Sequence, residues 1–481
     1  MLCCSSHFYL KGLHYDTRIT TLGHVQRGGS PSAFDRFQAT ILGVAAVDAL
    51  AAAQHGSLSV VVGLQGYSVA EKPLMECVRA TQAVEKHLKA KEFDAAFKAR
   101  GSAFAEFWQI LVAVSGAQQV PHGPQMAHAV AVATVGAPAP GMNHCCRVVV
   151  RMLMERGHRV LLVHGGFDGM EQNRFEEAVW MSCSGWAGAG GAFLGTGRKT
   201  PNEASAERIH RTLVGLGVRA LVVIGGYEAY AGALQLHKAC GKAVAIAVIP
   251  ATISKNCVGT EVSIGMDKAS NNLMVSCDQI KQSCIGYEKR VYVVESIGRS
   301  CGFQSLFGAI ASGADLVLLP ERPPKLQDMD AVLAVMRHRF TSTTAQIGLI
   351  INSESASDIF TTPFVRRLHE TSLKDIKVSA REALLSGLQQ GGDPSPMDRI
   401  FAGRMALAAV DHISRCLAQP DLTEHEAVAC GLVRDERVYT PLSVFERETN
   451  HKLRRPRDQP WLEPFLHAFD NVTFPPSKAS L

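Results

Sequence analysis

Four loops with small and polar residues each follow a short apolar segment of this 481-residue chain, and such loops can bind anions. They span residues 136–143 (G-A-P-A-P-G-M-N), 225–230 (G-G-Y-E-A-Y), 249–256 (I-P-A-T-I-S-K-N) and 295–302 (E-S-I-G-R-S-C-G). In the first loop, backbone amides and the start of the following helix could hold an anion. Small residues in a strand-to-helix turn are structural more often than not, so this loop alone remains open to either interpretation.

The segments that must position these loops alternate between short apolar runs and helical patterns. This alternation predicts an α/β fold with parallel-sheet, Rossmann-like subdomains. Ligands of such sheets bind at the carboxyl ends of the strands, where all four loops lie. The expected strands are 58–64, 129–135, 160–164, 220–224, 243–249, 290–294, 316–319 and 347–351, and the expected helices include 39–54, 75–100, 143–156 and 204–216.

A repeat organises the chain into two copies of one unit. Residues 17–36 contain H-V-Q-R-G-G-S-P-S-A-F-D-R, and residues 387–399 read G-L-Q-Q-G-G-D-P-S-P-M-D-R. A constant offset of 363 pairs Gln26 with Gln389 and also pairs Arg18 with Arg381 (389 − 26 = 381 − 18 = 363). We expect residues 1–115 to be an incomplete first copy that lacks its front, 116–126 to be a linker and 127–481 to be a complete second copy.

Composition describes a well-buried globular protein, with 47% hydrophobic and 19% charged residues. The formal net charge of +5 favours small anionic ligands over nucleic acid, because the densest basic run is only 452–457. Thirteen cysteines without C-x-x-C spacing fit reduced thiols, and the adjacent pair Cys145-Cys146 fits a core position better than a metal site. No segment predicts a secretion signal or a membrane span, so we expect a cytoplasmic protein.

The four loops in this order, with Arg290 before the fourth and Q-Q-G-G-D-P-S-P-M-D-R near the end, resemble the phosphofructokinase family, in particular the duplicated ATP-dependent enzymes of animals. The resemblance extends from about residue 15 to residue 461. It implies a first copy derived from the kinase half and a second copy derived from the effector-binding half. The family uses ATP and magnesium, held through G-G-D-G-S and T-I-D-N-D loops. Neither loop occurs in this sequence, so the resemblance implies no retained cofactor, metal ligand or catalytic residue.

The second copy differs from a kinase at the positions that matter most for the chemistry. Tyr227 replaces the metal-binding aspartate and Glu228 replaces a glycine, so a ring and a carboxylate would face the phosphates. Ser254 stands where the general base would be, and a hydroxyl accepts no proton near neutral pH without a base of its own. We therefore expect the second copy to bind a phosphorylated sugar without turning it over.

The resemblance also implies which residues bind the ligand, fructose 2,6-bisphosphate or fructose 6-phosphate. Arginines suit this task because guanidinium groups bind phosphate oxygens in pairs. Three departures from the family pattern are Gly387 for a histidine, Lys255 for an asparagine and Arg299 for a glycine. The effector-site residues carried over from the family are Arg198, Thr252, Ser254, Lys255, Asn256, Arg290, Ile297, Gly298, Arg299, Glu321, Arg381, Gln389, Gln390 and Arg454.

The first copy keeps part of a substrate site, for which the resemblance implies fructose 6-phosphate. Its residues are Arg18, His24, Val25, Gln26 and Arg27. Family sites of the effector type straddle a subunit interface, with the residues matching Arg290 and Arg381 coming from the neighbouring chain. A homo-oligomer, or a hetero-oligomer with full-length phosphofructokinase, is therefore implied.

Three functions remain open at this point. The chain could be a regulatory or assembly subunit that binds phosphosugars. It could phosphorylate fructose 6-phosphate, alone or in mixed oligomers. It could also be a piece of a longer, ordinary kinase. We further expect an exposed apolar face along residues 41–50, because the first copy lacks strands for it to cover.

Overall fold

The computed structural model describes residues 19–54, 59–115, 128–241, 243–286, 288–419 and 427–473. Residues 1–32 and 33–481 form two separate compact units. The described part of the first unit contains one short 3-10 helix, η1 (Gly23–Gln26), with all of its side chains exposed. All other elements belong to the second unit.

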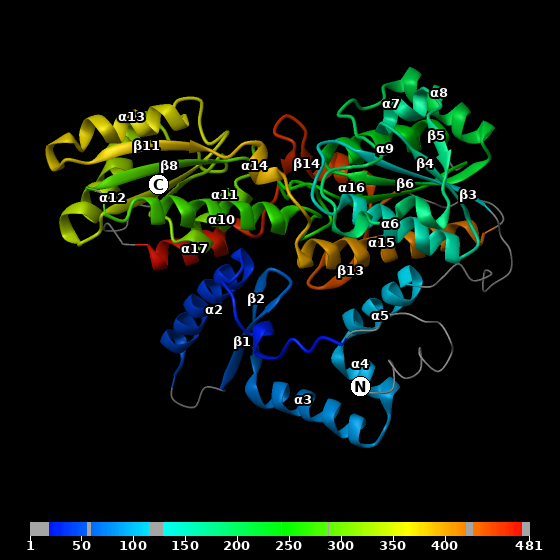
Figure 1. Ribbon diagram of the computed structural model, residues 1–481, viewed down its shortest axis with the longest axis horizontal. Coiled ribbons are helices and arrows are strands. Elements are labelled where there is room, and N and C mark those ends of the chain that lie inside the picture. Colours follow the sequence, from blue (N-terminus) through cyan, green and yellow to red (C-terminus); the bar gives the residue numbers. More distant parts are fainter. Residues whose placement is uncertain are drawn as a thin grey trace. The chain divides into compact units, whose positions relative to one another are not determined.

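A seven-stranded sheet forms the first α/β subdomain of the second unit, in the order β13-β12-β7-β6-β3-β4-β5 (Figure 1). Its strands are parallel except for β5 and β13, which pair antiparallel with their neighbours at the two edges. The centre is apolar on both faces, and every residue of β3 is buried, as helix-covered parallel strands require. The strands are β3 (Ala129–Val135), β4 (Arg159–Val163), β5 (Phe175–Glu177), β6 (Val218–Gly225), β7 (Ala245–Pro250), β12 (Val428–Val433) and β13 (Glu436–Pro441).

A four-stranded parallel sheet forms a second α/β subdomain, in the order β11-β8-β10-β9 (Figure 1). Two short hairpins complete the strands, β1 with β2 and β14 with β15. The remaining strands are β8 (Arg290–Ser296), β9 (Leu316–Leu318), β10 (Ile347–Ser353), β11 (Ser379–Leu384), β1 (Val60–Gln65), β2 (Ser68–Pro73), β14 (Thr449–Asn450) and β15 (Arg455–Pro456).

Helices follow most strands, as the alternating pattern predicts. Residues 75–100, expected as one helix, form two, because the chain turns between α3 and α4 through Lys91 in the left-handed region at φ 60°. The helices are α2 (Ala33–Ala52), α3 (Leu74–Lys89), α4 (Phe93–Arg100), α5 (Ser102–Ser115), α6 (Met142–Glu155), α7 (Gly166–Glu171), α8 (Glu203–Gly215), α9 (Tyr227–Cys240), α10 (Met266–Ser283), α11 (Phe303–Ser312), α12 (Met329–Ser342), α13 (Thr362–Ser372), α14 (Gly387–Gln390), α15 (Pro396–Leu417), α16 (Leu442–Glu448) and α17 (Leu462–Val472).

The sequence repeat has a structural counterpart. Helix α2 begins at residue 33 and α15 at residue 396, an offset of 396 − 33 = 363. Further along, the hairpin β1-β2 followed by α3 matches the hairpin β12-β13 followed by α16, with α3 starting at 74 and α16 at 442 (442 − 74 = 368). The repeat therefore extends beyond the glycine-rich turn. The offset changes from 363 to 368 because the second copy is five residues longer between its long helix and its hairpin, and this change conceals the rest of the repeat in the sequence.

Helix α2 packs on helices of the second copy instead of leaving its whole apolar face exposed. The ring of Phe37 stacks on Phe307 of α11 with 4.2 Å between centroids, and Ile41 is buried. The expectation of an exposed face is thus wrong for Ile41, because α11 and α17 cover it, whereas Val47 and Leu50 are exposed. The predicted domain division at residues 116–126 falls outside the described residues and stays a prediction.

Among the described residues, no helix is both long enough and apolar enough to span a bilayer.

Candidate functional site

A cavity of about 690 Å³ lies where the carboxyl ends of strands from both sheets meet. Loops after β3, β6 and β7 contribute from the seven-stranded sheet, and loops after β8, β10 and β11 contribute from the four-stranded sheet. Nine of the predicted effector residues are among its lining. The lining residues are Ala137, Pro138, Arg198, Gly226, Tyr227, Glu228, Ala251, Thr252, Ile253, Ser254, Asn256, Ile297, Gly298, Arg299, Ser300, Glu354, Ser355, Ser386, Gly387, Gln390, Lys452, Leu453 and Arg454.

The loop after β7 forms one wall through a tight local hydrogen-bond pattern. The Thr252 hydroxyl accepts a hydrogen bond from the Ser254 backbone amide at 3.2 Å, which folds the loop back on itself. The Asn256 side-chain amide donates to the backbone carbonyl of Arg454 at 2.9 Å and so ties this loop to the β14–β15 hairpin. Thr252 and Ser254 therefore present hydroxyl groups to the cavity from a fixed backbone.

The loop after β8 is held from two sides. Buried Gln389 accepts a hydrogen bond from the Ile297 amide at 2.9 Å and donates to the Ser296 hydroxyl at 3.2 Å. On the other side, the Glu354 carboxylate accepts from the backbone amides of Gly298, at 3.2 Å, and of Arg299. Gln389 thus positions this wall from behind and does not line the cavity itself.

Lys255 and Arg299, which differ from the family pattern, both have left-handed backbones. Their φ values are 49° and 51°, a region that glycine and asparagine adopt more readily than other residues. The family's asparagine and glycine at these positions therefore fit the same loop geometry. Each loop keeps its shape at a local backbone cost of order 1–3 kcal/mol.

Arg454 reaches the cavity from the hairpin and is held by two residues of the loop after β6. Its guanidinium donates to the Glu228 carboxylate at 3.0 Å and lies 5.1 Å from the centre of the Tyr227 ring. The Tyr227 hydroxyl in turn lies 3.0 Å from Nδ1 of His451. Because its carboxylate is already paired with a guanidinium, Glu228 does not fit a magnesium site, and Tyr227 offers only a phenol.

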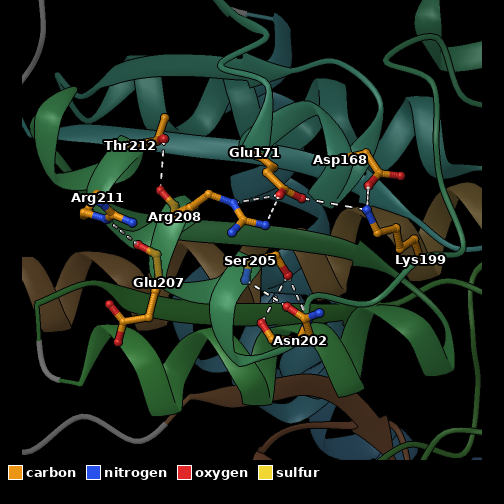
Figure 2. A network of polar contacts seen from close by, with 9 residues as sticks. All are labelled: Asp168, Glu171, Lys199, Asn202, Ser205, Glu207, Arg208, Arg211 and Thr212. Carbon is orange, nitrogen blue, oxygen red and sulfur yellow. Dashed lines mark hydrogen bonds and ion pairs between the residues drawn. The ribbon is translucent and has the colours of Figure 1, made fainter.

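Arg198 enters from the segment between β5 and α8, which a polar network anchors. Lys199 pairs with Asp168 at 2.9 Å, and Glu171 of the same helix, α7, accepts from Arg208 at 2.9 Å (Figure 2). The hydrogen bond to Asp168 raises the pKa of Lys199, so its charge is secure near neutral pH. Asn202 caps α8 by accepting from the Ser205 amide at 2.9 Å (Figure 2). The segment that carries the exposed Arg198 is thereby anchored through its neighbour Lys199, and no hydrogen bond of the Arg198 side chain is found among the described residues.

Besides Gln389, four predicted residues lie away from the cavity, for different reasons. Glu321 is turned inward, where it accepts from the Gly302 amide at 3.0 Å and pairs with Arg455 at 3.0 Å. Lys255 points to the opposite side of its loop, among the rings of Phe303 and Trp461. These positions place neither side chain against a ligand of the cavity.

Arg290 and Arg381, the other two, lie toward the amino ends of paired strands. Arg290 opens β8, and its Nε donates to the Ser379 hydroxyl at 3.3 Å, while Arg381 is on β11 and exposed. The cavity lies at the opposite, carboxyl end of both strands. These arginines do not contact the cavity of their own chain.

The first-copy residues belong to the other compact unit. His24, Val25, Gln26 and Arg27 lie in or beside η1 and are all exposed. Arg18 lies outside the described residues. Their predicted role in binding a substrate stays a prediction.

Two charged lining residues were missed by sequence reasoning. Glu354 follows β10, an expected strand whose loop was not considered. Lys452 stands in the basic run 452–457, which was considered only as evidence about nucleic-acid binding. The signal for Glu354 was its place at the carboxyl end of a parallel strand. Four cations and two carboxylates then face the cavity, which gives it a net positive charge suited to phosphate oxygens.

Known proteins share the sequence pattern of this chain. The family model described as Phosphofructokinase matches residues 6–50 and 129–413. The muscle-type ATP-dependent 6-phosphofructokinase of Homo sapiens is 37% identical over 465 residues, which cover 94% of this chain and 59% of that protein. The liver-type enzyme of Pongo abelii is 38% identical, over 94% of this chain and 58% of its own. This chain thus spans less than two thirds of the length of these relatives.

Solved structures confirm the expected α/β, phosphofructokinase-like fold. Pichia pastoris phosphofructokinase in the T-state superimposes with a TM-score of 0.89 at 31% identity, covering 98% of this chain and 56% of its own. The phosphofructokinase of Saccharomyces cerevisiae also gives a TM-score of 0.89, at 27% identity, over 98% of this chain and 64% of its own.

Proposed function

The chain belongs to the phosphofructokinase family, and we propose that its cavity binds a phosphorylated sugar of the fructose 2,6-bisphosphate type as a regulatory ligand. The observation that carries this proposal is the convergence of Arg198, Arg299, Lys452 and Arg454 on one cavity that also presents the hydroxyls of Thr252 and Ser254. Guanidinium and ammonium groups bind phosphate oxygens, and hydroxyl and amide groups bind sugar hydroxyls. A volume of about 690 Å³ is ample for a sugar bisphosphate.

The same residues support binding without phosphoryl transfer. Transfer needs a metal-bound triphosphate and a group that takes the proton of the attacking hydroxyl. Glu228 is paired with Arg454, and no carboxylate or imidazole hydrogen-bonds to the Ser254 hydroxyl in the described part of the chain. The cavity therefore holds and orients a phosphosugar, and the ligand leaves unchanged.

The proposal includes an oligomer. Arg290 and Arg381 lie too far along their strands to reach the cavity of their own chain, which suits a role at the cavity of a neighbouring copy or of a longer phosphofructokinase chain. His24, Gln26 and Arg27 would complete a fructose 6-phosphate site with residues from elsewhere. In this role the chain is an allosteric or assembly subunit of cytosolic glycolysis, with ATP and magnesium bound by its catalytic partners.

A catalytic role is the second candidate, because the curated relatives are named ATP-dependent 6-phosphofructokinases. A coupled assay with ATP, magnesium and fructose 6-phosphate separates the two roles. We expect no turnover by the purified chain. Sustained turnover that Ser254→Ala abolishes would replace the regulatory proposal with the catalytic one.

Thermal unfolding tests binding without assuming a mechanism. A ligand that binds only the folded state increases the free energy of unfolding, by about 2.7 kcal/mol at a ligand concentration of 100 Kd, and so raises the midpoint temperature of unfolding. We expect fructose 2,6-bisphosphate to raise the midpoint in wild type and not in the Arg198→Ala, Arg454→Ala double variant. Arg337→Ala is the matched control, because Arg337 pairs with Asp375 on the surface, away from the cavity. Equal shifts in all three proteins would refute the assignment of the site.

A further inference from the structure

A second cavity, of about 760 Å³, lies on the other side of the loop after β7. The loop is a wall shared by the two cavities, and its residues divide between them. Thr252, Ser254 and Asn256 line the first cavity, whereas Lys255 and Cys257 line the second. The second cavity plays no part in the proposed phosphosugar site.

The walls of this second cavity combine apolar and charged residues. They come from α2, from the β1–β2 hairpin, from the segment after β7 and from the stretch that leads into α17. Arg447 and Glu448 of the lining pair with each other at 3.0 Å. The charged lining residues are Lys255, Glu261, Arg447, Glu448, Arg457 and Asp458. The apolar lining residues are Ile41, Tyr67, Val69, Cys257, Val258, Val433, Pro456, Pro460, Trp461, Pro464 and Phe465.

One ammonium group stands against these walls. Nζ of Lys255 lies 5.0 Å from the centre of the Phe303 ring and 5.8 Å from that of Trp461. Within the described ranges, no carboxylate lies within 4.0 Å of it. The Glu261 carboxylate, which also lines the cavity, accepts a hydrogen bond from the Arg434 amide at 2.9 Å and acts on Lys255 only as a nearby charge.

Such a cation is costly to keep in this setting. Burial lowers the pKa of Lys255 to about 8, so the group still carries its charge at neutral pH. Contact with aromatic faces offsets part of the desolvation cost, and a paired anion offsets far more. The attraction between an anion in the cavity and the Lys255 ammonium would also be stronger than in water, because the surroundings have a lower dielectric constant.

We propose that this second cavity is a binding site for an anion with an apolar body, an aromatic or aliphatic carboxylate. The carboxylate pairs with the Lys255 ammonium, and the hydrocarbon body packs against Trp461, Phe465 and Val258. A sugar phosphate suits the position beside Lys255 poorly, because the rings of Phe303 and Trp461 next to this ammonium offer no hydrogen bonds to sugar hydroxyls. A neutral hydrocarbon would leave the ammonium without an anion.

A matched pair of probes tests the proposal, namely 2-naphthoate and 2-naphthylmethanol, which share the ring system and differ in charge. Calorimetric titration of the wild-type chain is expected to give at least tenfold tighter binding of the anion. Lys255→Met keeps the length and apolar stem of the side chain and is expected to abolish that preference. Lys452→Met, which removes a lysine of the first cavity, is expected to preserve it. Equal affinities for both probes in wild type, or an unchanged preference in Lys255→Met, would overturn the proposal.

A second measurement uses only the wild-type chain, so it does not depend on whether a variant folds. It also distinguishes this site from the phosphosugar cavity. Trinitrobenzenesulfonate labelling of the wild-type chain, read by mass spectrometry at Lys255, is expected to slow at least fivefold with saturating 2-naphthoate. Fructose 2,6-bisphosphate is expected to leave that rate unchanged, whether or not it binds the first cavity. Labelling of Lys255 at the same rate with and without 2-naphthoate would contradict the assignment.

Discussion

The guanidinium of Arg454 lies 3.0 Å from the carboxylate of Glu228, inside the cavity proposed to bind a phosphosugar. The side chain of Glu228 is only 12% exposed, whereas that of Arg454 is 43% exposed. The carboxylate therefore sets the position of the arginine and also competes with any phosphate for it. This pair links the loop after β6 to the proposed binding of a phosphosugar.

Replacing Glu228 by glutamine tests that competition. The variant keeps a hydrogen-bond acceptor for Arg454 and removes the negative charge, so we expect fructose 2,6-bisphosphate to bind about three- to tenfold more tightly. Calorimetry measures the change. Glu446→Gln, at an exposed ion pair with Lys238, is the control and should leave affinity unchanged. Weaker binding by Glu228→Gln would show that the charge is needed to position Arg454.

The neighbouring glutamines of α14 should separate stability from binding. Gln389 is buried and holds the backbone of Ile297, so Gln389→Leu leaves buried polar groups unpaired and should cost about 1–3 kcal/mol of unfolding free energy. Gln390 lines the cavity and donates to the Pro138 carbonyl at 2.5 Å, so Gln390→Leu should weaken ligand binding with little effect on stability. Urea unfolding and calorimetry on both variants distinguish the roles. Equal loss of stability in the two would contradict this division.

Gly387 offers space for the histidine that the family pattern has at this position. A Cβ atom there would meet no heavy atom of the described chain within 4 Å, and its φ is not in the left-handed region. Gly387→His adds a donor at the cavity and should tighten fructose 2,6-bisphosphate binding about tenfold. Gly387→Ala has the same backbone restriction without the donor and should match wild type. An unchanged affinity in Gly387→His would show that residue 387 does not face the ligand.

Lys255 makes a pH-dependent contribution to stability. Its pKa falls from 10.5 to about 8 on folding, so between these values the unfolded chain binds more protons and stability rises with pH. Lys255→Met should therefore be more stable than wild type at pH 7, by an amount on the order of 2 kcal/mol, with the difference shrinking as pH rises from 8 toward 10.5. Denaturant unfolding at several pH values gives this difference. A difference independent of pH would show that the ammonium is well solvated.

Much of the fold follows from local sequence patterns, because its central strands are buried on both faces. Strand β3 has the expected bounds, 129–135, since an uninterrupted apolar run of that length has few other structures available. Helix α10 was not anticipated, because its polar residues conceal an apolar face that only packing reveals. The second half of the repeat was likewise hidden by the change of offset between α2 and the β1–β2 hairpin.

The candidate site could be predicted as a set of loops but not as a set of side-chain directions. Lys255 and Ser254 are adjacent in sequence, yet Lys255 lines the second cavity and Ser254 lines the first. The side chains of Gln389 and Gln390 in the short helix α14 also point in different directions, because Gln389 is buried behind the cavity wall and Gln390 lines the cavity. Side-chain direction in a loop depends on φ and ψ at each residue, and the left-handed backbone of Lys255 is not apparent from its residue type.

Calorimetric titration of the oligomeric wild-type chain with fructose 2,6-bisphosphate tests the central claim most directly, with the Arg198→Ala, Arg454→Ala double variant titrated in parallel. The account predicts saturable binding at one site per chain in wild type and at least a hundredfold weaker binding in the double variant. Absence of binding in wild type, or the same affinity in both proteins, would contradict it.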